Sequence, residues 1–466
     1  MSAASAAPPR PAATWEGDAW PRTRRPLPWL FAAMLAMVFL VPFDAIHLDV
    51  KLPVSSDLDR FLVIAMIGTW AVGAALGGPK VVERLRPRGW AAAGIIFILV
   101  AVASIAFNAG RITNLAEWSD AQKHLAVLFS FGAVFAIVAL NLRAAELRAF
   151  SVLIVSLAVL TAMGTIYEKK SGYNVFYETA HTVLSPIASV DPAPTEIDST
   201  TESRPTITGP TRHALSVTSL LGMALPFAVV LAAIAQDRRR RLLWGVAACL
   251  LIAGALITQR KSGAVVPAIS LLVLFILRPR QLLRLAPFGI IALGVALVVT
   301  PGIFSTVREL GQTGSQDSTT GRTSDYPAVV PDLLTRPILG RGFGTLDSER
   351  VDQYRIFDNE YLGEAFQVGA LGLLAFLAVI ATPLFIARPV IRSDDPVRGP
   401  PALAAAAACC AFGVAAALYD ILTFPQAPYL FLFMAGMCTC AASAEVPAGW
   451  TARFPGGKRQ AQEARV

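Results

Sequence analysis

The sequence predicts an all-α polytopic membrane protein with about 12 transmembrane helices, and three observations support this fold class. Hydrophobic residues make up 55% of the 466 residues, whereas charged residues make up only 15%, below the roughly 25% that is usual in soluble domains. The mean hydropathy is +0.57. Apolar runs of about 17–25 residues, the length that a helix needs to cross a bilayer, recur along the chain. These observations exclude an ordinary soluble fold.

The apolar runs define the expected helices in chain order. They occupy residues 29–46, 61–78, 89–108, 124–141, 149–167, 214–235, 242–258, 263–278, 285–301, 361–387, 402–419 and 427–444. No small-residue cleavage site follows the first run, so we expect it to remain as a helix rather than act as a signal peptide. All five cysteines lie within the runs, where we expect them to pack as small apolar side chains.

Basic residues predict the orientation of these helices. Lys and Arg cluster in every second connection, for example at Arg238–Arg241, and positive connections are retained in the cytoplasm. Both termini are then cytoplasmic, with a disordered tail over residues 1–28, a membrane domain over residues 29–444 and a second tail over residues 445–466. This topology accounts for the net charge of +8, so the charge predicts no nucleic-acid partner.

Two connections are unusually long, and both lie on the outward side of the expected topology. They cover residues 168–213 and residues 302–360. Long ordered loops in membrane proteins are usually functional. The sequence therefore predicts a functional site on the extracytoplasmic side, beneath the second long loop.

The segment "TQRKSG" places Arg260 and Lys261 in a short outward connection, where the positive-inside tendency disfavours cations. Two fixed cations before a helix start suit an anion such as phosphate, because free N–H groups at Ser262 and Gly263 also attract negative charge. The alternative is that both side chains reach out to lipid headgroups.

Two further segments place basic residues at the outward side. "SRPTITGPTRHALS" brings Arg204, Arg212 and His213 to the start of a helix. The two arginines suit a second phosphate or a sugar, and His213 is either a site residue or an interfacial one. "LGRGFG" follows no strand, so we expect a tight loop that presents Arg341 rather than a nucleotide site.

Asp358 and Asn359 directly precede the apolar run at residues 361–387. A carboxylate at this outward boundary is able to accept the proton of a hydroxyl nucleophile, with Asn359 orienting a sugar. Acidic and amide side chains in the same place also cap helix N–H groups and complement the helix dipole. The residues alone leave both roles open.

Together these segments resemble the O-antigen ligase and O-antigen polymerase family of bacterial inner-membrane proteins. The matching pieces lie between residues 204 and 380 and are "TGPTRHAL", "TQRKSG", "TGR" at Thr320–Arg322, "RPILGRGFG", "DNEYL" and "VGALGLL". Their order, spacing and side of the membrane make the set fairly specific, and the family also has about twelve helices.

The resemblance implies a multi-pass enzyme of the bacterial cytoplasmic (inner) membrane. It would transfer a glycan from an undecaprenyl-diphosphate-linked donor to a hydroxyl of a glycan or lipid acceptor at the outer face, with inversion and with no metal or other cofactor. The diphosphate would be bound by Arg260 and Lys261 together with Arg204 or Arg212. The substrate-binding residues would be His213, Arg322, Arg341 and Tyr361.

The expected catalytic residues are Asp358, Asn359 and Arg260, and one of them departs from the family pattern. The family usually has a histidine as base before "N-x-Y-L", where this chain has Asp358. A carboxylate also accepts a proton, but its lower ordinary pKa makes it a weaker base unless desolvation raises that pKa.

Two other function classes compete with this interpretation. Polyprenyl-phosphate-sugar glycosyltransferases often carry an acidic pair in the first outward loop, and "SSDLDR" places Asp57 and Asp59 there. Such a pair would work with a divalent metal. The third class is a lipid-linked sugar flippase or transporter. Transporters usually show internal repeats and polar groups near the bilayer midplane, whereas the charges here gather at the outer rim.

Overall fold

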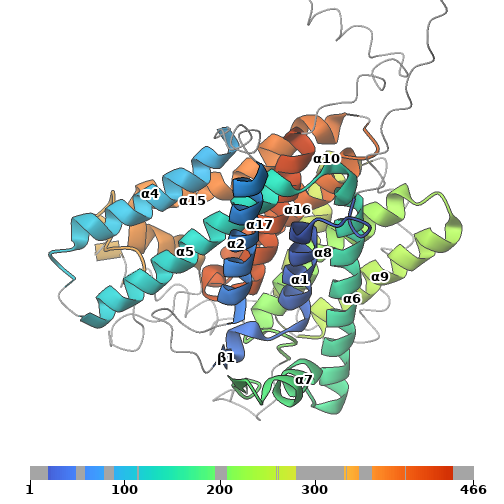
Figure 1. The fold of residues 1–466 in the computed structure, drawn as a ribbon, viewed down its shortest axis with the longest axis horizontal. Helices are drawn as coiled ribbons and strands as arrows, with labels where there is room; N and C mark the ends of the chain where they lie inside the picture. Colours follow the sequence, from blue (N-terminus) through green and yellow to red (C-terminus); the bar gives the residue numbers. More distant parts are fainter. Residues whose placement is uncertain are drawn as a thin grey trace, which may run out of the picture.

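The computed structural model describes residues 19–48, 58–77, 89–112, 115–194, 207–258, 260, 262–279, 330–331, 333–345, 359–393 and 395–443. These residues are mainly α-helical (Figure 1). The principal helices are α1 (Pro26–Leu40), α2 (Leu58–Gly77), α4 (Gly89–Asn108), α5 (Leu115–Asn141), α6 (Leu147–Ser171), α7 (Val175–Leu184), α8 (Ala214–Ile234), α9 (Arg238–Leu256), α10 (Ser262–Leu277), α15 (Glu360–Arg392), α16 (Gly399–Ala416) and α17 (Gln426–Ser443).

Seven helices in the described part of the chain are long and apolar enough to cross a membrane. They are α2, α4, α5, α6, α8, α15 and α16, whereas α1 and α10 are apolar but shorter. Helices occupy eleven of the twelve predicted ranges, and the remaining range, 285–301, lies outside the described residues. The all-α membrane fold class is confirmed, while the count of twelve spans and the side of the termini stay predictions.

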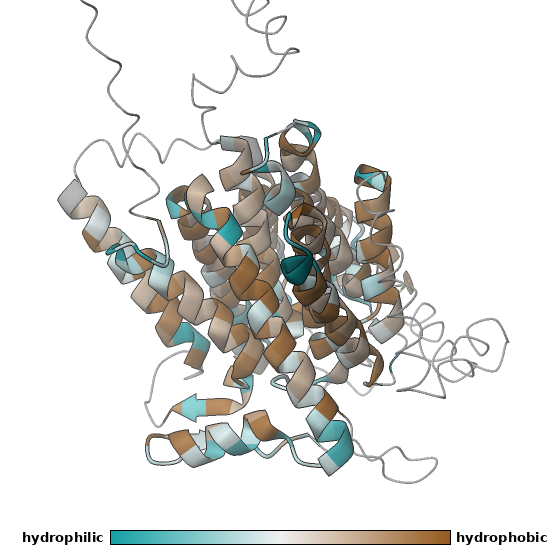
Figure 2. Ribbon diagram, turned by 90° about the vertical axis from the view of Figure 1, so that its right-hand side faces the viewer, coloured by the Kyte–Doolittle hydropathy of each residue, from teal (hydrophilic) through white to brown (hydrophobic). Residues whose placement is uncertain are grey.

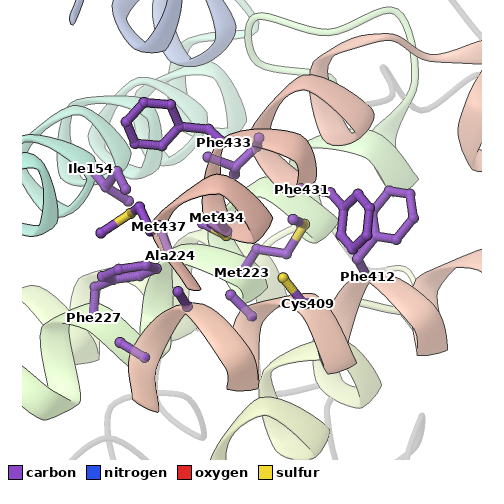
Figure 3. Packing of buried hydrophobic residues seen from close by; sticks show 14 of the residues in the cluster. Ile154, Met223, Ala224, Phe227, Cys409, Phe412, Phe431, Phe433, Met434 and Met437 are labelled. Atoms are coloured by element: carbon purple, nitrogen blue, oxygen red, sulfur yellow. The ribbon is translucent and has the colours of Figure 1, made fainter. Parts of the chain in front are cut away.

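Helices α8 and α16 form the centre of the bundle. Among the described residues, 89% of the spanning part of α8 is buried inside the protein, against 17% for α2 at the periphery. Figure 3 shows Met223 and Phe227 of α8 near Cys409 of α16 and Met434 of α17. Because α16 is a row of alanines, its neighbours approach its backbone closely.

Glycines set two close helix contacts around this centre. A Cβ atom at Gly222 of α8 would lie 2.7 Å from Cγ1 of Val266 in α10. A Cβ atom at Gly254 of α9 would lie 2.8 Å from Cβ of Ala162 in α6. Small residues at such positions are what allow helices to pack in a membrane, and the first contact holds α8 against α10.

Helix α7 and a small sheet mark one end of the bundle, called here the sheet end (Figures 1 and 2). Strand β1 (Ile46–Leu48) pairs antiparallel with β2 (Ala188–Val190), with Ile46 opposite Val190. Part of the long connection at residues 168–213 is therefore built into the fold.

Helix α1 ends at Leu40, six residues before the predicted boundary. Val41 has extended backbone angles, φ −118° and ψ 127°, because a residue that precedes proline is disfavoured in the helical region. Pro42 thus stops the apolar run from continuing as a helix. The chain then makes one turn of 3₁₀ helix, η2 (Phe43–Ala45), and enters β1.

Helix α15 is interrupted at Gly369, where φ is 68° and ψ is −168°. Residues 336–345 pack into this break. At distances of 2.8–3.2 Å, backbone N–H groups donate from Arg341 to Phe366, from Gly342 to Gln367, from Ala370 to Pro337 and from Leu371 to Ile338. Non-helical backbone at membrane depth is tolerated where protein satisfies its polar groups, and this loop does so.

Candidate functional site

The sheet end gathers the starts of four helices, α8, α10, α15 and α17. The first two starts lie side by side, because the hydroxyl oxygens of Thr218 in α8 and Ser262 in α10 form a hydrogen bond of 3.0 Å. The N-terminal end of a helix carries partial positive charge and favours anions. The C-terminal ends of α1, α9 and α16 lie at the same end of the bundle, so this preference applies to an anion placed directly at a helix start.

The connection between α16 and α17 joins the starts of α15 and α8. Within it, η5 (Ile421–Thr423) supplies the N–H of Leu422, which donates to Oε2 of Glu360 at 2.9 Å. The ring of Phe424 lies 5.2 Å from the ring of His213. Two segments that the sequence singled out far apart are thus brought into one cluster.

Arg212 and His213 both have partners within the protein. His213 caps α8, with its Nδ1 accepting the N–H of Leu215 at 3.2 Å. Arg212 forms an ion pair with Asp191, and Nε2 of His47 lies 3.4 Å from the same carboxylate oxygen. The Arg212 side chain is 39% exposed, so its charge remains accessible from outside the bundle.

Arg260 lies half-buried in the short connection between α9 and α10. Its carbonyl accepts the N–H of Gly263 at 2.9 Å. A Cβ atom at Gly263 would lie 2.3 Å from the carbonyl oxygen of Ala255, so only glycine fits this turn. The tight turn holds Arg260 beside the start of α10.

The start of α15 gives Asn359 and Tyr361 defined structural roles. Asn359 caps the helix, with Oδ1 accepting the N–H of Tyr361 at 3.0 Å, which is the second of the two roles that the sequence left open. The Tyr361 hydroxyl donates to the carbonyl of Gly413 in α16. Their contacts with substrate stay predictions.

The first turns of α15 contain an acidic pair, Glu360 and Glu364, which the sequence analysis did not identify as a site. Glu360 is 6% exposed and Glu364, one turn later, is 1% exposed. Oε2 of Glu364 is buried without a hydrogen-bond partner. Ionisable residues inside membrane helices usually mark function. The signal was present, because two glutamates four residues apart interrupt an otherwise apolar run.

Other buried polar groups at the sheet end also lack hydrogen bonds. They are the carboxylate of Asp44, the side-chain amide of Gln426 and the hydroxyl of Ser216. The Gln426 side chain nevertheless lies close enough to Asp44 for a hydrogen-bonding effect that lowers the pKa of the carboxyl. Most buried polar groups in proteins are hydrogen-bonded, so these groups mark the sheet end as a polar part of the interior.

Asp44 has a strongly perturbed acidity. Burial raises its pKa to about 6 from the ordinary 3.8, against the opposing effect of the Arg212 charge. Nearby Asp59 raises it further by a smaller amount. The sheet end therefore holds a carboxyl group that titrates close to neutral pH.

In the "LGRGFG" loop, the side chain of Arg341 points into the protein rather than toward the outside. Nη2 of Arg341 lies 3.4 Å from Oε1 of Glu117 in α5, and the side chain is only 17% exposed. Its carbonyl accepts a hydrogen bond of 2.6 Å from Arg111. Arg341 thus ties the loop to α5, and its contact with substrate stays a prediction.

An apolar cavity of about 100 Å³ adjoins the cluster. It lies among α4, α5, α15, α16 and α17, and Phe97, Phe131 and Phe376 contribute to its walls. Leu422 lines it and also donates its N–H to Glu360. The cavity therefore begins next to the buried acidic pair.

Several sequence-predicted residues lie outside the described residues, namely Asp57, Arg204, Lys261, Arg322 and Asp358. Asp59 lies within them, and it is 1% exposed. Its carboxylate pairs with Arg60 at 2.9 Å and accepts the Tyr429 hydroxyl at 2.8 Å. These contacts give Asp59 a structural role. Among the described residues, no group of three or more His, Cys, Asp or Glu side chains is arranged to hold a metal ion.

Comparison with known proteins identifies the region that carries these features. Residues 246–377 match the family model described as O-antigen ligase. The match runs from within α9 to within α15 and includes Arg260, the "LGRGFG" loop and the acidic pair. No curated protein matches the chain. The described helices are those of a multi-pass membrane protein, and its residues 246–377 are similar to the O-antigen ligase family, which confirms the resemblance drawn from the motifs.

Proposed function

We propose that this protein transfers a glycan from an undecaprenyl-diphosphate-linked donor to an acceptor hydroxyl, as ligase or polymerase of a cell-surface polysaccharide. The reaction takes place at the outer face of the cytoplasmic membrane, with inversion at the sugar and without a metal. The observation that carries the proposal is the family match over residues 246–377, which contains Arg260 and the start of α15.

The chemistry requires a stabilised leaving group and a proton acceptor. The bond between the sugar carbon and the diphosphate oxygen breaks, and the diphosphate leaves with the electron pair. Arg260 and Lys261 at the α10 start, with Arg204 or Arg212, stabilise that charge. The hydroxyl oxygen bonds to the sugar carbon as its proton passes to Asp358.

The remaining predicted residues position the glycan. Asn359 is adjacent to Asp358 in the chain, and it caps α15. The glycan would be oriented by Asn359, His213, Arg322, Arg341 and Tyr361. The apolar cavity beside Leu422 would accommodate part of the polyprenyl chain, because its lining is almost entirely apolar.

The test is glycan transfer by purified protein in EDTA, from an undecaprenyl-diphosphate-linked donor. We expect Arg260→Ala to lower kcat/KM by about 10²–10³, the usual loss of a group that stabilises developing charge. We expect Asp358→Asn to lower kcat by about 10²–10⁴, the usual contribution of a general base. Arg239→Ala is the matched control, because Arg239 is an exposed arginine at the opposite end of the bundle.

Each outcome separates the competing functions. Full activity of Arg260→Ala would remove Arg260 from the diphosphate site. Transfer that requires added metal would favour the metal-dependent glycosyltransferase class. Absence of transfer by the parent protein, combined with movement of the donor across vesicle membranes, would favour a flippase.

A further inference from the structure

A second hollow lies at the end of the bundle opposite the sheet end. It consists of two adjoining cavities of about 500 and 580 Å³ that share Arg148, Leu231 and Pro400 among their walls. Its lining comes from the segment before α1, the starts of α6, α9 and α16, and the end of α8.

Three arginines from three different elements line this hollow, which we call the arginine cavity. Arg22 precedes α1, Arg148 lies in the first turn of α6 and Arg240 lies in the first turn of α9. All three are exposed. Arginine stays charged at any physiological pH. Arg148 borders both of the adjoining cavities, Arg22 borders the first and Arg240 borders the second.

Other arginines at this end have partners within the protein, whereas the side chains of the three cavity arginines, like those of the neighbouring Arg238 and Arg239, have none among the described residues. Arg25 pairs with the buried Glu146, and Arg398 pairs with Asp395. Arg278 donates to the carbonyl of Ile391. No hydrogen bond or ion pair within the described chain engages the side chains of the three cavity arginines.

One acidic residue also lines the arginine cavity. It is Asp237, whose Oδ1 caps α9 by accepting the N–H of Arg239 at 3.2 Å. Its charge offsets one of the three arginines, so the cavity keeps a net positive charge. A ligand with one phosphate group complements that charge.

The walls of the arginine cavity are apolar, which distinguishes an anchored lipid from a small soluble anion. Leu231 and Ile234 line both of its parts, and Trp244 lines the second. Leu243 also lines it and is 59% exposed, on the part of α9 that faces away from the bundle. A phosphate among the arginines would therefore continue into an acyl chain along α9.

We propose that the arginine cavity binds an anionic phospholipid, with its phosphate among Arg22, Arg148 and Arg240 and an acyl chain along Leu243 and Trp244. Basic pockets between membrane helices are a recurring mode of headgroup recognition. This site is independent of glycan transfer, because it lies at the other end of the bundle.

The experiment measures lipid binding to the full-length protein by native mass spectrometry in detergent. Phosphatidylglycerol and phosphatidylcholine of the same acyl composition are titrated against the parent and against an Arg148→Gln/Arg240→Gln double variant. We expect phosphatidylglycerol to bind the parent at least about 10-fold more tightly than phosphatidylcholine, and the double variant to lose that preference. An Arg238→Gln/Arg239→Gln variant is the matched control, because these neighbouring arginines do not line the cavity.

Two results would overturn the proposal. In the first, the control variant loses the preference as completely as the cavity variant, which would assign the binding to general surface charge. In the second, inorganic phosphate alone at millimolar concentration displaces phosphatidylglycerol completely, which would assign the cavity to a soluble phosphate. Loss of the preference in the cavity variant alone, with the thermal stability of the lipid-free protein retained, supports the lipid site.

Discussion

Asp44 is the residue that most directly couples the folded protein to pH. Its pKa in the folded state is about 6, against an ordinary value of 3.8. Between these two values the folded protein binds the proton more tightly than the unfolded chain does. The stabilising effect of the neutral carboxyl is therefore complete below about pH 4 and is lost as the pH rises through 6.

We predict that thermal stability falls between pH 4 and pH 7, with a contribution from Asp44 of up to about 3 kcal/mol. Asp44→Asn should make this fall smaller, because the amide stays neutral at every pH. The measurement is the free energy of unfolding, or Tm in detergent, across this range. Equal slopes for the parent and Asp44→Asn would show that the carboxyl is solvated in the folded state.

Gly369 is a second residue at which a substitution should change the stability of the protein. Its φ of 68° disfavours any side chain, and a Cβ atom there would lie 2.4 Å from the carbonyl carbon of Ile338. We predict that Gly369→Ala destabilises the protein by about 2–4 kcal/mol. Gly363→Ala, in the same helix, is the control, because its Cβ would meet its nearest neighbour at 4.0 Å. It should be neutral or slightly stabilising. Thermal unfolding of the two variants side by side decides the matter.

Among single residues, the structure decides between roles that the sequence left open and shows buried polar residues that the sequence did not identify. Asn359 was expected either to orient a sugar or to cap a helix, and the structure shows it capping α15. Glu364 and Gln426 were not anticipated as site residues, because their burial depends on helices that are distant in sequence. Short-range patterns do not contain such contacts.

At the scale of single elements, the start of α15 contains two glutamates whose substitution should have opposite effects on the free energy of unfolding. Glu360 accepts the N–H of Leu422 and so fixes η5. We predict that Glu360→Ala costs about 1–3 kcal/mol, because that buried N–H loses its acceptor. Glu364→Gln should be neutral or stabilising by about 1 kcal/mol, since Oε2 of Glu364 has no hydrogen-bond partner and the amide is of similar size without an ionisable group. Chemical or thermal unfolding of both variants checks the pair, and a large loss in Glu364→Gln would contradict it.

Helices were easier to predict from the sequence than the elements between them. Long apolar runs identify helices such as α8 and α4 directly, because their length matches the membrane. Helix α7 and the β1–β2 sheet were not predicted. Each strand has only three residues, and the paired residues are at least 140 positions apart in the chain. The Ser-, Thr- and Pro-rich composition of the intervening loop gave no sign of this pairing.

At the scale of the whole molecule, the alternating helices predict that the sheet end faces outward. Val183 in α7 is 64% exposed at the sheet end, and Arg239 is exposed at the other end. We predict that a membrane-impermeant maleimide labels Val183→Cys in intact cells and labels Arg239→Cys only after lysis. The parent chain, with its five cysteines, provides the background. The opposite labelling pattern would invert the predicted topology and move the proposed reaction to the cytoplasm.

The break in α15 also has a consequence for how substrates bind. Detaching residues 337–342 would strip backbone partners from both sides of Gly369, and four hydrogen bonds would have to be exchanged for contacts with lipid. Each unsatisfied group in hydrocarbon costs several kcal/mol. We therefore expect residues 337–342 to remain attached to α15 while a lipid-borne substrate binds.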